Sequence, residues 1–344
     1  MNSVVLSKIS SIVKNLNLPH KVHISDEIIS EMGSILVVKV VNAKTKYNIL
    51  ELQSGRMSAL QQGDVIPVVL GNRSAMQGVY GIVPKNLLVG GNIDILNMGG
   101  VAGECIDYNP NVGDAVHCVV LGAIVDKNNK PLNLLNNAIV KHSDKIISKP
   151  KLIAVIGSGM NCGKTTVGSA VVQILSSQNK NISVAKVSGV GAMRDIYSML
   201  DHGAKTGLSF VDAGLPSTCI DDKNLVINAA KGIINVLSEL NPDGIFLEFG
   251  DGLYGDYGVK ELLIDKEIRE SISICVLCAN DIPGAVKMYQ DCLEIGVKPD
   301  IISGPVTDNA IGINAIKNLI GVEIFNAFRK NSIDVIVKIL NIAV

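Results

Sequence analysis

A glycine-rich stretch in the middle of the chain carries the residues best suited to chemistry. Residues 157–166 read GSGMNCGKTT. Glycines allow successive backbone N–H groups to turn toward one anion, and a helix that follows adds its positive N-terminal end. Lys164 can then reach the β- and γ-phosphates of a nucleotide, and the Thr165 hydroxyl can bind Mg²⁺. The pattern predicts a phosphate-binding loop with contacts from Gly159, Asn161, Cys162, Gly163, Lys164, Thr165 and Thr166.

The spacing within this loop departs from the strict motif. The pattern G-x-x-x-x-G-K-[ST] needs a glycine where this chain has Ser158, and glycines flank that position instead. A short apolar strand is expected just before the loop and an amphipathic helix just after it, which is the context that a phosphate loop requires. We therefore expect a variant loop that still binds phosphate.

Charged residues stand at the ends of two other expected strands. Lys186 lies at the end of the strand 182–187, and Glu248 lies in the strand 245–249. Phosphate-bound Mg²⁺ keeps several waters and takes one or two carboxylates, so Thr165 and Glu248 are candidate ligands. An ion pair between Glu248 and Lys186 is the structural alternative. Asp251 is a weaker candidate, because an Asp-Gly pair is also ordinary turn chemistry.

These motifs resemble two families of SIMIBI-class P-loop proteins over about residues 151–305. They are the molybdopterin-guanine dinucleotide accessory proteins (MobB) and the dethiobiotin synthetases. The resemblance implies that Lys186 matches a strand-terminal lysine and that Glu248 matches a glutamate supporting Mg²⁺. It also aligns Asp195 with an acidic residue that faces metal and phosphate, although helical periodicity alone equally allows a solvated position for Asp195. The expected catalytic residues are thus Lys164, Lys186 and Glu248, and the expected metal ligands are Thr165, Asp195 and Glu248.

The elements that must position these residues alternate along the second part of the chain. The polar segment HSDKIISKP at 142–150 predicts a domain junction, which divides the chain into residues 1–145 and 146–344. Alternating strands and helices after it require right-handed crossovers, and hence a doubly wound, mostly parallel α/β sheet. Helices are expected around residues 167–175 and 229–240, after the cap Asp281, and around residues 333–340. Strands are expected at 152–156, 182–187, 245–249, 272–277 and 300–303.

The first 145 residues have a different pattern. Short apolar segments between Gly, Asn and Pro turn signals predict a smaller β-rich domain, a barrel or a sandwich, and they match neither family. Apolar residues at helical spacing also predict a helix over Val4–Leu16. The expected strands are Ser34–Asn42, Lys46–Leu52, Asp64–Leu70, Gly78–Val83, Asn92–Asn97 and Asp114–Val125.

Composition excludes several classes of protein. The 344 residues are 47% hydrophobic and 18% charged with a net charge of −1, which argues against a disordered chain and against a basic nucleic-acid surface. The longest apolar run, Cys118–Val125, is too short to cross a bilayer, and no signal peptide is evident. The seven cysteines are typical of buried thiols in a reducing compartment, so we expect a cytoplasmic protein. In particular, the Cys275–Cys278 pair is expected in the core, because strand residues three apart face opposite ways.

A further polar segment could contact a substrate. Residues 210–219 read FVDAGLPSTC and have no counterpart in either family. Asp212, Ser217 and Thr218 are therefore candidate substrate contacts, and a helix-capping connector explains them equally well.

Three functions are compatible with these features. The first is a Mg·ATP-dependent enzyme that phosphorylates or activates a small carboxylate-type metabolite. The second is a MobB-like nucleotide-binding accessory protein, and the third is a switch ATPase, which would need a signature lysine where this chain has Gly159. ATP is preferred over GTP because Cys278–Asp281 is not N-K-x-D, and Asn280 is the candidate base contact. We favour the first function. The expected partners are a nucleotide and a metabolite, and neither a nucleic acid nor a membrane is expected. The resemblance also allows a homodimer.

Overall fold

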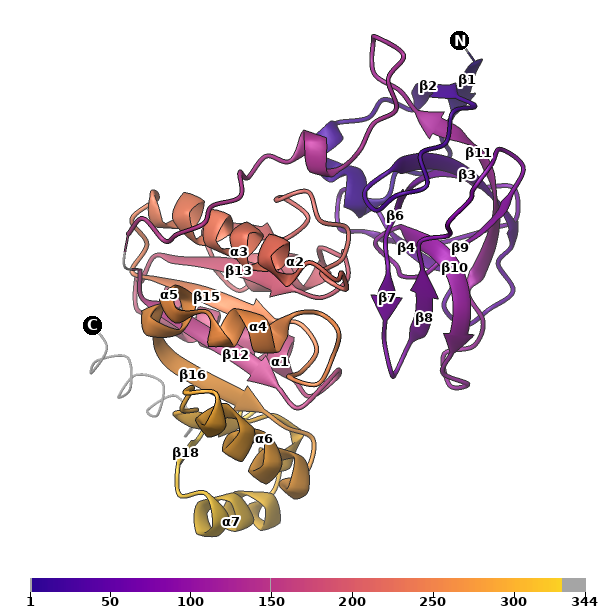
Figure 1. The fold of residues 1–344 in the computed structure, drawn as a ribbon. Helices are drawn as coiled ribbons and strands as arrows, with labels where there is room; N and C mark the ends of the chain where they lie inside the picture. Colours follow the sequence, from indigo (N-terminus) through magenta and orange to yellow (C-terminus); the bar gives the residue numbers. More distant parts are fainter. Residues whose placement is uncertain (1, 149, 330–344) are drawn as a thin grey trace. The chain divides into compact units, whose positions relative to one another are not determined.

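The computed structural model describes residues 2–148 and 150–329, and these form two compact units (Figure 1). The first unit comprises Met1–Val140 together with Val190–Arg194 and Phe210–Asp221. The second unit comprises Lys141–Gly189, Asp195–Ser209 and Asp222–Val344. The sequence predicts one boundary at 145/146, whereas the structure divides the chain after Val140 and returns two later segments to the first unit.

The first unit contains a closed β-barrel. Strands β11, β3, β6, β10 and β9 pair in a ring, because β9 joins both β10 and β11. Only the β6–β10 pair in this ring is parallel. Alternate residues such as Leu36, Val38 and Val40 of β3 point into its core. The strands of this unit are β1 (Asn2–Val5), β2 (Lys21–Ser25), β3 (Ile35–Asn42), β4 (Ile49–Glu51), β5 (Met57–Ala59), β6 (Val65–Leu70), β7 (Arg73–Ser74), β8 (Val79–Ile82), β9 (Asn92–Ile95), β10 (Val101–Tyr108) and β11 (Val116–Ile124).

Several local predictions for this unit were wrong. The helix expected over Val4–Leu16 is replaced by β1 and a short 3₁₀ helix, η1 (Ser11–Leu16), because β1 pairs with β2 and Val5 stays exposed. Strands β2, β5 and β7 were missed. So was β10, because Gly99, Gly100 and Gly103 indicated turns there. Its hydrogen bonds come from β6, β8 and β9, which are distant in sequence, so tertiary pairing overrides the local preference.

The first returning segment, residues 190–194, is held in the first unit by buried polar groups. The Met193 backbone N–H donates to Glu51 Oε2 at 2.7 Å, and Ser11 Oγ donates to the same oxygen. Asn97 Nδ2 donates to the carbonyl of Gly191 at 2.8 Å. Because Glu51 is fully buried, releasing residues 190–194 would leave its carboxylate without the Met193 donor.

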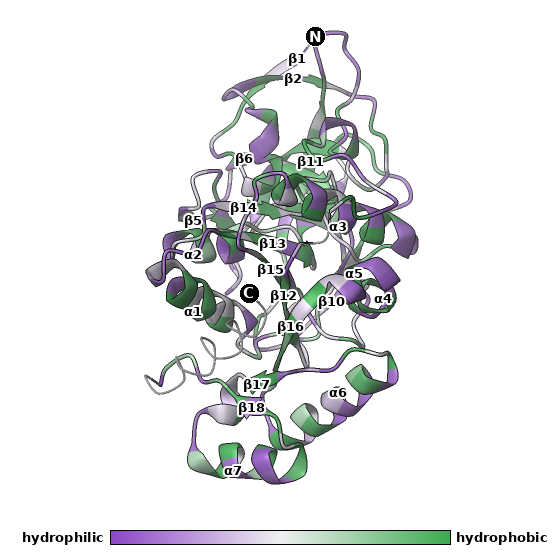
Figure 2. Cartoon of the chain, turned by 90° about the vertical axis from the view of Figure 1, so that its left-hand side faces the viewer, coloured by the Kyte–Doolittle hydropathy of each residue, from purple (hydrophilic) through white to green (hydrophobic). Residues whose placement is uncertain are grey.

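The second unit is a parallel α/β sheet with helices on both faces, as expected. Its strand order is β14-β13-β15-β12-β16-β17-β18, and every pair is parallel. Helices α1 and α2 cover one face, and α3, α4 and α5 cover the other (Figure 2). The order reverses at β12, and ligands of such sheets bind at the carboxyl ends of the strands near that reversal. The strands are β12 (Leu152–Gly157), β13 (Ile182–Ser188), β14 (Thr206–Ser209), β15 (Gly244–Phe249), β16 (Ile272–Cys278), β17 (Ile301–Ser303) and β18 (Glu323–Ile324).

Several helices of the second unit begin at a residue whose side chain accepts a hydrogen bond from a backbone N–H. Asp281 accepts a hydrogen bond from the Gly284 N–H, as predicted for the start of α6. The expected helix at 333–340 lies outside the described residues. Within the described residues, no helix is both long enough and apolar enough to span a bilayer. The helices are α1 (Lys164–Ser177), α2 (Arg194–Asp201), α3 (Lys223–Ser238), α4 (Val259–Ile264), α5 (Lys266–Ser271), α6 (Ile282–Glu294) and α7 (Ala310–Leu319), with 3₁₀ turns η2 (Leu135–Asn137) and η3 (Pro305–Thr307).

Candidate nucleotide site

The glycine-rich loop joins β12 to α1, which is the context expected of a phosphate-binding loop. Gly163 caps α1 with φ +91°, and Asn161 also has a positive φ of +57°. Lys164 is only 7% exposed, and its ammonium donates to the Gly159 carbonyl at 2.6 Å. Cys162 Sγ donates to the same carbonyl at 3.1 Å. The loop thus folds around its own lysine, which is held at the N-terminal end of α1, where anions bind.

Four charged or hydroxyl groups gather beside this loop. Lys186 and Glu248 are direct partners on the neighbouring strands β13 and β15. Lys186 Nζ forms an ion pair with Asp195, at the start of α2. Thr165 Oγ1, in the first turn of α1, donates to Glu248 Oε1 at 3.3 Å. The structure therefore brings together the predicted catalytic and metal residues from β13, β15, α1 and α2.

Glu248 is the most perturbed carboxyl of this cluster. It is 2% exposed, and no described residue forms a hydrogen bond with its Oε2 atom. Burial, followed by the charge of Asp195, raises its pKa to about 7, while Lys186, Lys164 and the Thr165 hydroxyl act in the opposite direction. A buried carboxylate with one unsatisfied oxygen is costly, and a cation or a proton would relieve that cost.

These residues fit a magnesium ion that arrives with phosphate. In the described part of the chain, no group of three or more His, Cys, Asp or Glu side chains is arranged to hold a metal. Mg²⁺ needs no such cage when phosphate oxygens and waters complete its shell. Thr165 and the unsatisfied oxygen of Glu248 would supply protein ligands, with Asp195 as a neighbouring carboxylate already paired to Lys186.

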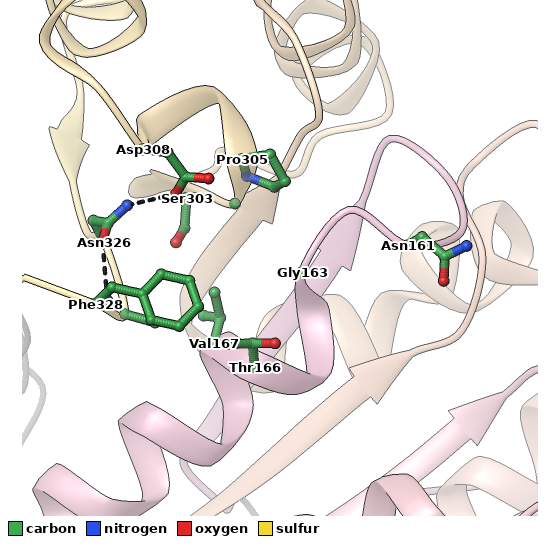
Figure 3. A pocket seen from close by; sticks show the side chains of 11 residues that line it. Asn161, Gly163, Thr166, Val167, Ser303, Pro305, Asp308, Asn326 and Phe328 are labelled. Carbon is green, nitrogen blue, oxygen red and sulfur yellow. Dashed lines mark hydrogen bonds between the residues drawn. The ribbon is translucent and has the colours of Figure 1, made fainter.

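A cavity of about 250 Å³ adjoins the first turn of α1 (Figure 3). One wall is the segment after β17, where Gly304 packs on the loop so closely that a side chain there would collide with the Cys162 carbonyl. In the other wall, Asn326 Nδ2 donates to Asp308 Oδ1 at 3.0 Å. The cavity is lined by Asn161, Gly163, Thr166, Val167, Ser303, Gly304, Pro305, Asp308, Asn326, Ala327 and Phe328.

Most of the residues that line this cavity were not predicted as site residues from the sequence. Asn280, the candidate base contact, is exposed and is not among the lining residues, so its role stays a prediction. The Gly304–Pro305 turn after a short strand was an available signal, because it lies at the carboxyl edge of the sheet. Asn326 and Phe328 carried no signal, since only the fold brings this distant segment to α1.

The three candidate substrate residues lie in the first unit. Asp212, Ser217 and Thr218 are fully buried. Asp212 Oδ1 accepts from Lys14 Nζ at 2.6 Å and from Asn15 Nδ2 at 3.0 Å, and the Asp212 carbonyl accepts from two backbone N–H groups. These contacts give Asp212 a structural role, and substrate binding by the segment stays a prediction.

Five of the seven cysteines are buried, as expected, whereas Cys105 and Cys219 are partly exposed. Cys275 and Cys278 are both buried in β16, and all seven cysteines are free thiols. Burial is the largest cause of the raised pKa of Cys278, which makes its thiolate scarce at neutral pH. The C-x-x-C pair is thus part of the core.

Comparisons with known proteins add little to this site. No protein-family model matches the chain, and no curated protein matches it. Chloroplast FtsY from Physcomitrella patens is 12% identical with a TM-score of 0.39, covering 56% of this chain and 63% of that one, which is less than two thirds of its length. FtsY from Thermotoga maritima is 14% identical with a TM-score of 0.39 over 62% and 79%. The kinase domain of Escherichia coli tyrosine kinase ETK is 10% identical with a TM-score of 0.36 over 47% and 70%.

Proposed function

We propose that the second unit binds a magnesium nucleoside triphosphate, ATP in the first instance, and that the protein is a phosphoryl-transfer enzyme. The observation that carries this proposal is the convergence of Lys164 with Thr165 and the buried Glu248, whose second oxygen has no partner. A phosphate loop without such a carboxylate would account for anion binding alone. The added carboxylate supports binding of a cation, and with it chemistry at the γ-phosphate.

Each charged residue has a distinct part in this proposal. The backbone N–H groups of the loop and Lys164 bind the β- and γ-phosphates. Lys186, held by Asp195, stabilises negative charge that develops on the transferred group. Bound Mg²⁺ would neutralise phosphate charge, and Thr165 and Glu248 would hold it. Catalysis by positioning and charge stabilisation needs no nucleophilic side chain.

The cavity beside α1 is proposed to hold the nucleoside. Pro305 and Phe328 offer apolar contacts to a base, and Asp308 and Asn326 offer polar ones. Phe328 is 81% exposed, so its ring is accessible to a base. Asn161, Gly163 and Thr166 of the loop line this cavity, so a nucleotide bound at the loop can extend into it (Figure 3).

The acceptor of the phosphoryl group is proposed to be a small carboxylate-type metabolite, as in the dethiobiotin synthetases that the loop resembles. The burial of Asp212, Ser217 and Thr218 favours a second candidate, a MobB-like accessory protein. Burial removes these side chains as ready substrate contacts and leaves the acceptor without identified ligands.

Nucleotide binding by Lys164 is the first test. Lys164→Ala should lose binding of Mg·ATP and Mg·GTP by at least 100-fold in titration calorimetry, because its ammonium is committed to the phosphate loop. Lys205→Ala, at an exposed lysine of the same unit, is the matched control and should bind like the parent. Parent-like affinity of Lys164→Ala would refute the assignment of the loop.

A stimulation assay separates the two candidates. An enzyme with a small acceptor should release nucleoside diphosphate slowly alone and much faster with one compound from a panel of carboxylates and amines, because the acceptor completes the transfer geometry. An accessory protein should show no such stimulation. Recovery of a tight protein partner in its place would favour the accessory reading.

A further inference from the structure

Asp251 occupies a position beside the phosphate loop that its turn sequence does not explain. It follows β15 three residues after Glu248 and has a φ of +70°, in the left-handed region that non-glycine residues rarely adopt. An aspartate can adopt this backbone at a modest cost, and such a cost is typically maintained where function requires it.

The next residue presses this turn onto the phosphate loop. A Cβ atom on Gly252 would lie 2.8 Å from the Gly157 carbonyl oxygen and 3.1 Å from the Gly159 amide nitrogen. Gly252 is therefore in backbone contact with both ends of the loop's first turn. The chain also curls over the carboxylate, because a side chain on Gly255 would collide with Asp251 Oδ2. These two contacts fix Asp251 at the loop.

The three carboxylates of the site, those of Asp195, Glu248 and Asp251, differ in the groups that they contact. Asp195 is paired with Lys186, and Glu248 accepts from Thr165. Asp251 is half-buried, and within the described residues no lysine or arginine forms an ion pair with it. Its charged neighbours are Lys164, whose charge stabilises the carboxylate, and Asp256, whose charge opposes it.

We propose that Asp251 is a catalytic residue that orients the attacking nucleophile, water in the absence of another acceptor, opposite the γ-phosphate held by Lys164. This inference rests on the proposed nucleotide binding and assigns a step within it. The water oxygen forms a bond to the γ-phosphorus while the bond to the β,γ-bridging oxygen breaks, and the diphosphate leaves with that electron pair. The water proton passes to the Asp251 carboxylate and then to solvent, so the products are nucleoside diphosphate, inorganic phosphate and a proton. Burial raises the pKa of Asp251, which makes its carboxylate a better proton acceptor than an exposed one.

The test is single-turnover hydrolysis of Mg·ATP and Mg·GTP by the full chain. Asp251→Asn keeps the shape and tolerates the left-handed backbone, so it should bind nucleotide within about twofold of the parent and hydrolyse it about 100-fold more slowly. Asp251→Gly relaxes the backbone and also lacks the carboxylate, so it should show the same loss. Glu294→Gln, at an exposed carboxylate of α6 in the same unit, is the matched control and should keep the parent rate.

The pH profile distinguishes catalysis from a structural role. The parent rate should fall on the acid side as Asp251 is protonated, and that limb should vanish in Asp251→Asn. A rate for either variant within threefold of the parent overturns the proposal, as does a parent that binds nucleotide but releases no phosphate. A parent that binds no nucleotide refutes the proposed function itself, which the Lys164→Ala comparison identifies separately.

Discussion

Glu248 is the side chain of the site whose negative charge is most strongly disfavoured by its surroundings. Three features act on it together: complete burial, the nearby charge of Asp195 and an oxygen without a partner. The two lysines and the Thr165 hydroxyl offset only part of that cost, so its pKa remains near 7. A group of this kind links the stability of the protein to pH and to the binding of a cation.

The pH dependence of stability tests this residue. Since the folded pKa of Glu248, about 7, exceeds its ordinary value of 4.5, the folded protein holds a proton that the unfolded chain releases. Its contribution is therefore present below pH 4.5 and is lost as pH rises through 7. Glu248→Gln should have a higher free energy of unfolding than the parent at pH 8, by up to about 3 kcal/mol, and the gain should shrink toward pH 5. Urea titrations in EDTA measure both values, and a gain independent of pH would contradict the assignment.

The same substitution should impair function while it stabilises the fold. Without a carboxylate oxygen for the cation, Glu248→Gln should turn over nucleotide more slowly at limiting Mg²⁺, with a smaller change in nucleotide affinity. Turnover measured against Mg²⁺ concentration provides the check. A parent-like curve would remove Glu248 from the cation site.

At the scale of elements, a buried lysine connects two helices of the second unit. Lys231 of α3 is 5% exposed and pairs with Asp265 at 2.8 Å and Glu267 at 2.7 Å, at the start of α5. Its ammonium also donates to the Asp144 carbonyl, in the segment that enters the second unit. One cation thus joins three pieces of chain. Without the Lys231 ammonium, the carboxylates of Asp265 and Glu267 would lose the positive charge that they share.

Substitution of this lysine tests the connection. Lys231→Met keeps the apolar stem and removes the charge, so we expect a loss of about 2 kcal/mol in the free energy of unfolding, less than for a wholly buried pair because Glu267 is partly exposed. Lys266→Met is the matched control. Its partner Glu270 lies 3.9 Å away, and both side chains are largely exposed, so its loss should be under about 0.5 kcal/mol. Equal losses in chemical denaturation would disprove the role of Lys231.

At the scale of the whole molecule, the chain crosses between the two units several times. Residues 190–194 and 210–221 leave the parallel sheet and complete the first unit. The first of these segments supplies the Met193 N–H to Glu51, and the second supplies Asp212 to Lys14. The first unit is therefore built from three separate stretches of sequence. Residue 195, at the nucleotide site, directly follows one of them.

This connectivity predicts that residues 1–140 do not fold alone. Without the returning segments, the buried Glu51 carboxylate would keep the Ser11 hydroxyl but lose the Met193 N–H, and the partly exposed Lys14 would lose Asp212. We expect the isolated fragment to lack a cooperative thermal transition by circular dichroism. The full chain should show one under the same conditions. A fragment that unfolds cooperatively near the temperature of the full chain would contradict this prediction.

The sequence by itself determined the parts that depend on neighbouring residues. The phosphate loop, the strand before it and the helix after it lie within about 25 residues, and glycine content and apolar spacing specify them directly. The alternation of strands and helices likewise predicted the parallel sheet. Because ligands of such sheets bind at the carboxyl ends of the strands, the sequence also predicted that Lys186 and Glu248 lie at one edge of the sheet. Spacing alone could not show that Asp195 pairs with Lys186.

Only the tertiary structure decided what depends on pairing between distant segments. Strand β10 exists because three other strands supply its hydrogen bonds, and β1 replaces a helix because β2 is available to pair with it. The cavity is lined by residues of α1 together with residues from 303–308 and 326–328. No local sequence pattern predicts that these segments lie close together. Asp251 is ordinary turn chemistry in the sequence. It becomes a candidate for catalysis because Gly252 packs on a loop that lies nearly 100 residues earlier in the chain.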